Sequence, residues 1–214
     1  MITLSDYLKD PCGAAALPFW KEKSLRAPED MRILHAKDFD AALLQTRRDT
    51  PYFRLLHDLK NIGAAVLPEG YFLRTADAAY DIPMLAHLIN ACYETISVTE
   101  NEVYGFTKRA VYVPELWVVV ETQEGEPCAA GIGEYDAEAN EGALEWIQVL
   151  PAFHRKGLAR ALVNELLTRL SKLARFATVS GEVNNPSSPE ALYRACGFTG
   201  NDVWHVLTKK EEAL

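Results

Sequence analysis

The sequence predicts an α/β fold built on a mixed β-sheet with helices on both faces. From Tyr71 onward, short apolar runs typical of strands alternate with stretches of helical period. Two of the intervening turns are short, which favours successive hairpins and therefore an antiparallel meander. A long amphipathic stretch then separates two further strand-like runs, and a strand, crossover helix and strand form a parallel pair. Together these observations predict both kinds of pairing in one sheet.

The first part of the chain is expected to be an N-terminal extension, residues 1–69, that packs on a core of residues 70–214. Its prolines divide it into short pieces, and a Pro-Glu-Gly turn at 68–70 marks its end. Three elements are expected there: a helix at 4–10 capped by Ser5, a strand at 31–36 and a helix at 50–62 opened by Thr50 and Pro51. The last of these has apolar residues at helical spacing.

The core contains the alternating elements. In chain order we expect a strand at 71–76, helices beginning at Asp81 and Thr99, strands at 116–122, 127–138 and 143–150, a helix at 157–174, a strand at 176–183, a helix at 188–198 and a strand at 203–209. Gly125 and residues 141–142 are expected to form the hairpin turns. The long helix carries a leucine stripe wide enough to lie on a sheet.

The charge balance narrows the classes of partner. Thirty acidic residues against 22 Lys and Arg give a formal net charge of −8. Phosphate backbones and anionic lipid surfaces are bound through a surplus of Lys and Arg, so we expect neither a nucleic-acid partner nor a membrane partner. No apolar run approaches the ~18 residues that a membrane span needs. An amine substrate is compatible with this acidic balance.

The cysteines and histidines do not form a metal-binding pattern. Cys12, Cys92, Cys128 and Cys196 are scattered, without a C-x-x-C pair and without clustered histidines. We therefore expect neither a metal site nor a disulfide framework. Free thiols, together with an N-terminus that lacks the pattern of an export signal, predict a cytoplasmic protein.

The most informative stretch is EWIQVLPAFHRKGLARALV, residues 145–163, a strand followed by a loop and the start of the long helix. Backbone N–H groups in the first turn of a helix have no internal partner, so they can bind an anion. Gly157 and Ala159 leave room for a phosphate, and the neighbouring basic residues are His154, Arg155, Lys156 and Arg160. The alternative is an ordinary solvated loop. Neither a P-loop nor a dinucleotide-binding glycine motif fits this sequence.

Two motifs resemble those of the GNAT N-acetyltransferase superfamily. Residues 149–159, VLPAFHRKGLA, are similar to its acyl-CoA signature, a strand end followed by [QR]-x-x-G-x-[GA] at a helix start. Residues 184–187, NNPS, and 191–198, ALYRACGF, are similar to its Asn-containing loop and its L-Y-x-x-x-G-F helix end. The resemblance covers about two-thirds of the chain. His154 replaces the usual Gln or Arg, and a loop about one residue longer leaves the alignment of Asn184 and Asn185 open.

This resemblance implies a GNAT-like acyl-CoA N-acyltransferase fold with a splayed central sheet. It also implies an enzyme that moves an acetyl group from acetyl-CoA to a primary amine by direct attack in a ternary complex, without a metal. The diphosphate would sit on the amides from Arg155 to Ala159, and the pantetheine would pair with the strand before them. The implied cofactor-binding residues are Ile147, Gln148, Val149, His154, Arg155, Lys156, Gly157, Leu158, Ala159, Arg160 and Asn185.

Two residues are expected to be catalytic. Even spacing along one strand would place Glu145 on the same face as Ile147 and Val149, where its carboxylate could take the proton of the amine. Glu145 could instead be a structural ion-pair partner, and Glu134 and Asp136 are alternative bases. Tyr193 matches the family tyrosine that protonates the leaving thiolate, although a core tyrosine bonded locally is the other interpretation.

The acceptor does not follow from the sequence. A small amine and a peptide or protein amine both remain open, and a homodimer is possible. Four other functions also remain open: transfer of a longer acyl chain, transfer to a hydroxyl group, a CoA-binding sensor that performs no chemistry, and a plain interaction domain that does not bind CoA.

Overall fold

A single eight-stranded sheet forms the centre of the computed structural model, which describes residues 2–93 and 96–210. The strand order is β1-β8-β2-β7-β6-β5-β4-β3. The strands are β1 (Arg32–His35), β2 (Arg47–His57), β3 (Tyr71–Thr75), β4 (Trp117–Thr122), β5 (Pro127–Asp136), β6 (Glu141–Val149), β7 (Phe176–Glu182) and β8 (Thr199–Lys209). Only β6 and β7 pair in parallel among these strands, so the predicted mixed sheet is confirmed.

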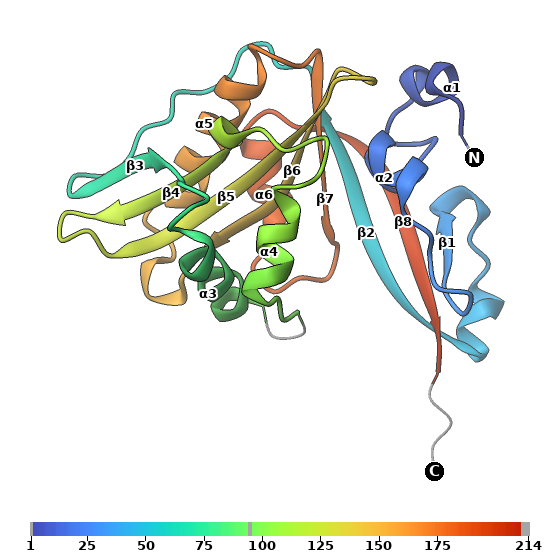
Figure 1. Cartoon of the computed structure of the whole chain (residues 1–214). Coiled ribbons are helices and arrows are strands. Elements are labelled where there is room, and N and C mark those ends of the chain that lie inside the picture. The colour runs from blue at the N-terminus through green and yellow to red at the C-terminus, as the bar shows by residue number, and fades with distance from the viewer. Residues whose placement is uncertain (1, 94–95, 211–214) are drawn as a thin grey trace.

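Helices cover both faces of the sheet, as predicted (Figure 1). They are α1 (Leu4–Lys9), α2 (Phe19–Ser24), α3 (Ile82–Cys92), α4 (Glu100–Phe106), α5 (Leu158–Leu170) and α6 (Pro189–Ala195). The leucine stripe of α5 packs with α6 on one hydrophobic core, while α3 and α4 pack on a second core across the sheet. Among the described ranges, every helix is too short or too polar to span a bilayer.

The helix predicted at residues 50–62 is wrong, because this segment is mainly β2. The strand lies between β7 and β8 and pairs antiparallel with both, with Leu55 opposite Val179 on one side. Backbone hydrogen bonds on both edges and burial on both faces override the local helical spacing. β2 is therefore an inner strand, although it belongs to the predicted extension. The division into an N-terminal extension, residues 1–69, and a core domain of residues 70–214 stays a prediction.

Two smaller expectations are also corrected. Thr3, not Ser5, caps α1, because its hydroxyl accepts a hydrogen bond from the Asp6 amide at 3.1 Å. Residues 141–142 are not a turn. They begin β6, and the turn lies just before them, where Asn140 adopts a positive φ of 51°.

A buried ion pair ties the N-terminal residues to the sheet. Arg54 of β2 and Glu141 of β6 are each only 1% exposed, and their closest side-chain atoms are 3.4 Å apart. The Glu141 carboxylate also accepts hydrogen bonds from the Tyr7 hydroxyl (2.7 Å), the Phe19 amide (3.0 Å) and the Thr178 hydroxyl (2.5 Å). One carboxylate thus joins α1, α2, β2, β6 and β7.

The sheet opens between β6 and β7, which diverge in Figure 1. Their pairing ends where Leu144 faces Val179, yet β6 continues to Val149. On its other edge, β6 stays paired with β5. The second half of β6 therefore has one edge without a strand partner, which is the splay that the resemblance implies.

Candidate active site

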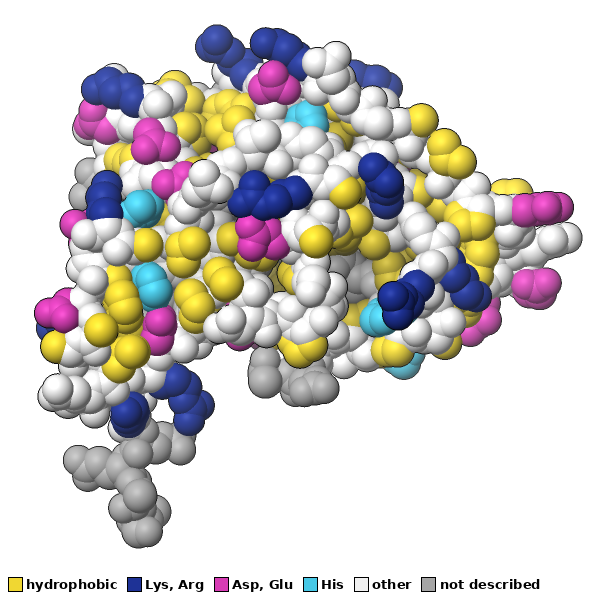
Figure 2. Space-filling view, turned by 180° about the vertical axis from the view of Figure 1, so that it is seen from behind, with side chains coloured by type: hydrophobic (Ala, Val, Ile, Leu, Met, Phe, Trp, Pro, Cys, Tyr) yellow, Lys and Arg dark blue, Asp and Glu magenta, His cyan; other side chains and the backbone are white. Residues whose placement is uncertain are grey.

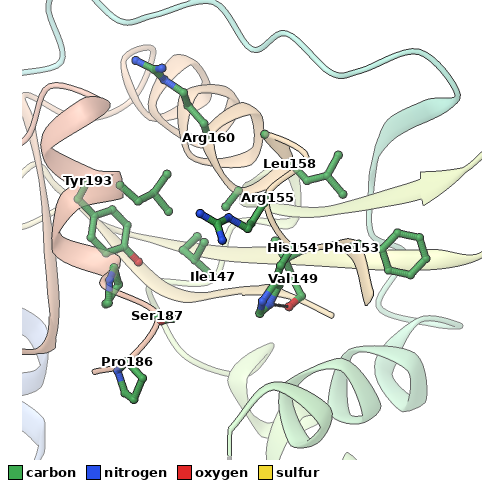
Figure 3. Close-up of a pocket in the computed structure, with 14 residues that line it drawn as sticks. Ile147, Val149, Phe153, His154, Arg155, Leu158, Arg160, Pro186, Ser187 and Tyr193 are labelled. Carbon is green, nitrogen blue, oxygen red and sulfur yellow. Dashed lines mark hydrogen bonds between the residues drawn. The ribbon is translucent and has the colours of Figure 1, made fainter. Parts of the chain in front are cut away.

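A cavity of about 630 Å³ lies where the sheet opens, between β6, the start of α5 and α6 (Figure 3). The predicted site residues that line it are Ile147, Val149, His154, Arg155, Gly157, Leu158, Ala159, Arg160 and Tyr193. Phe153, Pro186, Ser187, Pro189 and Leu192 complete the lining. Two parts of the sequence, residues 147–160 and 186–193, thus meet around one space.

The start of α5 presents unbonded backbone amides to this cavity. Gly157 is the N-cap, with φ of +85° and no side-chain cap. The first helical bond runs from the Ala161 amide to the Gly157 carbonyl at 3.1 Å. Within the described part of the chain, the amides from Arg155 to Arg160 have no hydrogen-bond acceptor. Such a helix start is suited to bind a phosphate or another anion.

The basic residues of the loop take different positions. Figure 3 shows Arg155 reaching into the cavity, while Arg160 points outward; Arg160 donates a hydrogen bond to the Ala195 carbonyl at 2.9 Å. Lys156 does not line the cavity: its ammonium donates to the Tyr71 hydroxyl at 2.9 Å and lies 5.0 Å from the Phe153 ring centroid. On the face seen in Figure 2, the surface is hollowed and Lys and Arg side chains stand on the rim. Arg155 is therefore the cation best placed to contact an anion there.

The free edge of β6 offers main-chain groups to the cavity. The Leu150 amide bonds to the Cys128 carbonyl of β5 at 2.9 Å, so the preceding residue, Val149, points its amide and carbonyl away from β5. The Val149 carbonyl lies 2.8 Å from His154 Nε2, which donates when that nitrogen carries the proton. By the same alternation, the main chain of Gln148 faces β5, and its 3% exposed side chain does not line the cavity.

Tyr193 brings a phenol to the wall of the cavity. Its ring packs against Phe53 and Phe198, with centroid distances of 6.2 and 5.7 Å. Its hydroxyl has no hydrogen-bond partner among the described residues, so the local bond of an ordinary core tyrosine is not found. Burial raises the pKa of Tyr193, and the nearby Tyr93 and Glu145 raise it further. Because its pKa is raised, the phenol keeps its proton at neutral pH and has it available to donate.

The placement expected for Glu145 is wrong. Ile132 of β5 faces Trp146 while Gly133 faces Leu144, so Glu145 is the extra residue of a β-bulge. The bulge breaks the alternation of side chains, and Leu144, rather than Glu145, shares the core of Ile147 and Val149. Glu145 does not line the cavity. Its carboxylate pairs with Lys21, and its charge lies close enough to Tyr193 to influence that pKa.

Asn185 does not line the cavity either. Its side-chain oxygen accepts hydrogen bonds from the Ser187 amide at 2.9 Å and the Ser187 hydroxyl at 2.7 Å. This is a local turn of the kind that Asn forms with its own backbone. Its effect is to place Pro186 and Ser187 on the cavity wall, opposite α5.

A second group of residues, which sequence reasoning missed, lies around Glu134 of β5. The Trp20 indole N–H donates to one carboxylate oxygen of Glu134 at 3.0 Å, and Arg109 donates to the other at 3.1 Å. Burial raises the pKa of Glu134 to about 7, and the charge of Glu145 adds to this effect. No local motif marks Trp20 or Lys21, which are more than 100 positions away from their partners.

The other alternative base, Asp136, stands apart from this group. Its carboxylate accepts a hydrogen bond from the Glu138 amide at 2.9 Å, in the turn between β5 and β6.

Tyr93 and Phe106 pack against Trp146, next to the bulge, with centroid distances of 5.6 and 6.3 Å. The side of β6 that faces away from α5 therefore carries these aromatic rings together with the carboxylates of Glu134 and Glu145.

Comparisons with known proteins agree with this arrangement. Residues 82–198 match a family model described as the acetyltransferase (GNAT) family. A GCN5-related N-acetyltransferase from Sphaerobacter thermophilus superimposes with a TM-score of 0.73 at 19% identity, over 86% of this chain and 61% of that one. This chain therefore spans less than two-thirds of that protein's length. No curated protein matches this chain significantly.

Two further solved structures show the same fold. A GCN5-related N-acetyltransferase from Kribbella flavida gives a TM-score of 0.58 at 13% identity, over 85% of this chain and 68% of that one. The ribosomal-protein-S18-alanine N-acetyltransferase from Escherichia coli gives 0.52 at 21% identity, over 67% and 96%. At 13% and 21% identity, these similarities show a shared fold and nothing beyond it.

Proposed function

The chain belongs to the GNAT acetyltransferase family, and from this premise we propose that it transfers an acetyl group from acetyl-CoA to a primary amine. Acyl-CoA-dependent acyl transfer is the general activity of the family. The observation that carries the proposal is the cavity at the splay, where unbonded amides of α5 meet the free edge of β6.

The donor substrate would be held by main-chain groups. The amides from Arg155 to Arg160 would receive the diphosphate, and Arg155 would add a charged contact. The pantetheine arm would run along β6 as an added strand. The Val149 amide, which points away from β5, would then donate to the thioester carbonyl and stabilise negative charge that develops on its oxygen.

Proton transfer would involve both predicted catalytic residues. The amine must lose a proton, and Glu145 would accept it directly or through a water molecule. The amine nitrogen forms a bond to the carbonyl carbon, the C–S bond breaks, and the thiolate takes the proton of the Tyr193 hydroxyl. The absence of a local partner for that hydroxyl in the described structure supports this role. The acceptor would be a small amine or the exposed amine of a peptide.

A thiol-release screen tests the proposal. The protein is mixed with acetyl-CoA and a panel of amines, peptides and polyamines, and free CoA thiol is measured, while calorimetry measures CoA binding separately. We expect binding of CoA together with release that depends on an amine. Binding without release for any acceptor would favour the sensor, and the absence of binding would refute the proposal.

Gly157→Ala is expected to weaken CoA binding about 10-fold. The φ of +85° costs a residue with a Cβ about 1–2 kcal/mol, so the loop is expected to relax and move the amides out of alignment. Gly125→Ala is the matched control, since Gly125 has φ of +81° in a hairpin turn and likewise has open space around its Cβ position. Calorimetry on both variants should show weaker binding for Gly157→Ala alone; equal affinity would contradict the assignment.

A further inference from the structure

Helix α2, in the N-terminal segment, contacts carboxylates at the bulge in β6 and on the neighbouring strand β5. Lys21 forms an ion pair with Glu145, and the two side chains are only 16% and 14% exposed. The preceding residue, Trp20, donates to Glu134. Two consecutive residues of α2 thus contact two carboxylates on neighbouring strands of the sheet.

The position of α2 is fixed by buried contacts. The Phe19 amide donates to Glu141 at 3.0 Å, and the Phe19 ring, 2% exposed, packs against Tyr7 at a centroid distance of 5.2 Å. Glu141 begins the strand that carries Glu145. The contact with Glu141 therefore holds α2, and with it Lys21, next to β6. The Lys21 ammonium is directed at the Glu145 carboxylate.

The charges in this cluster balance closely. When both are ionised, Glu134 and Glu145 carry two negative charges, and Lys21 and Arg109 carry two positive ones. Burial and the charge of Glu145 raise the pKa of Glu134, while Lys21 and Arg109 lower it. The charge of Glu145 also contributes to the raised pKa of Tyr193 in α6. Loss of one cation would leave two carboxylates to share the charge of Arg109 alone.

We propose that Lys21 is a positioning residue for the transfer reaction, which orients the Glu145 carboxylate and lowers the pH at which the Glu145–Glu134 pair takes up a proton. This inference rests on the proposed function and deepens it, because it makes the N-terminal segment part of the catalytic site. A carboxylate can take the proton of the acceptor amine only while it carries no proton itself.

The test compares the pH dependence of kcat/KM in wild type, Lys21→Met and Lys21→Arg. Without Lys21, the carboxylate pair retains a proton to higher pH, because like charges with fewer cations nearby favour the neutral form. The acidic limb of the profile should therefore move up by about one pH unit, which lowers kcat/KM about 10-fold below that limb. Lys21→Arg keeps a positive charge at this position, so its pH profile should equal that of wild type.

Lys23→Met is the matched control. Lys23 lies on the same helix and pairs with Glu138 in the turn between β5 and β6, but their side chains are 41% and 51% exposed. Its profile should equal that of wild type. CoA affinity should be the same in all these proteins. Should Lys21→Met unfold, Lys21→Gln carries the same test.

The outcomes separate the two proposals. If wild type releases thiol and Lys21→Met keeps the wild-type pH profile, the role of Lys21 is refuted while the proposed function stands. If wild type binds CoA but acetylates nothing, the proposed function fails and this inference fails with it. A carboxyl NMR titration gives a readout without turnover: proton uptake by the pair should occur at higher pH in Lys21→Met, and an unchanged titration would overturn the inference.

Discussion

Replacement of Arg54 by methionine is expected to lower the free energy of unfolding by about 3–5 kcal/mol. The substitution leaves the Glu141 carboxylate buried without its cation, and an unpaired buried charge is strongly destabilising. Arg54 also donates to the Tyr7 hydroxyl at 2.9 Å, so the contact between α1 and the sheet weakens as well. Denaturant unfolding at neutral pH measures the change.

The double variant Arg54→Met/Glu141→Leu distinguishes a lost attraction from an orphaned charge. It should recover much of the stability, because it removes the buried charge together with its partner. Lys60→Met removes an exposed lysine whose ammonium lies 4.0 Å from Asp58, and its unfolding midpoint should not change. A loss below about 1 kcal/mol for Arg54→Met would show that the ion pair does not secure the N-terminal segment.

Tyr193→Phe is expected to lower kcat about 100-fold with little change in CoA affinity. The variant keeps the ring that packs on Phe53 and Phe198 and removes only the hydroxyl at the cavity wall. A positioned proton donor contributes a factor of this order or larger. The loss should fall on turnover, because the proton is needed only as the thiolate leaves. Steady-state rates and calorimetry together measure the split.

Tyr135→Phe is the control for this substitution. It removes the same group from β5, where the Tyr135 hydroxyl donates to the Asn140 side chain at 3.2 Å, away from the cavity. Its turnover should match wild type. If Tyr193→Phe also turns over at the wild-type rate, the leaving thiolate receives its proton from another donor, and Tyr193 is only a packing residue.

The order of the elements from β3 to β8 could be predicted because each has a clear local period and a turn or proline beside it. β2 could not. Phe53, Arg54 and Leu55 are consecutive and all buried, so the strand lacks the alternation that identifies a half-buried one. Its partners β7 and β8 lie more than 100 residues later, and the hydrogen bonds that decide its conformation are invisible locally.

The candidate site likewise has one part that could be predicted from the sequence and one part that could not. The donor cavity is built mainly from one continuous segment, from Ile147 to Arg160, and its geometry follows from a strand, a loop and a helix start. The bulge at Glu145 adds one residue without a sequence signal, which reverses the face expected for that side chain. The contacts of Lys21 and Trp20 depend on tertiary packing, so no spacing in the sequence could indicate them.

Amide NMR of the 15N-labelled protein during titration with CoA shows whether the start of α5 holds the donor substrate. If the start of α5 binds the diphosphate, the resonances from Arg155 to Arg160 should shift more than those of other helix starts, such as α3 at Ile82. The shifts should saturate together with the calorimetric binding curve. Saturable binding that leaves those amides unshifted would place CoA elsewhere and contradict a diphosphate site at the start of α5.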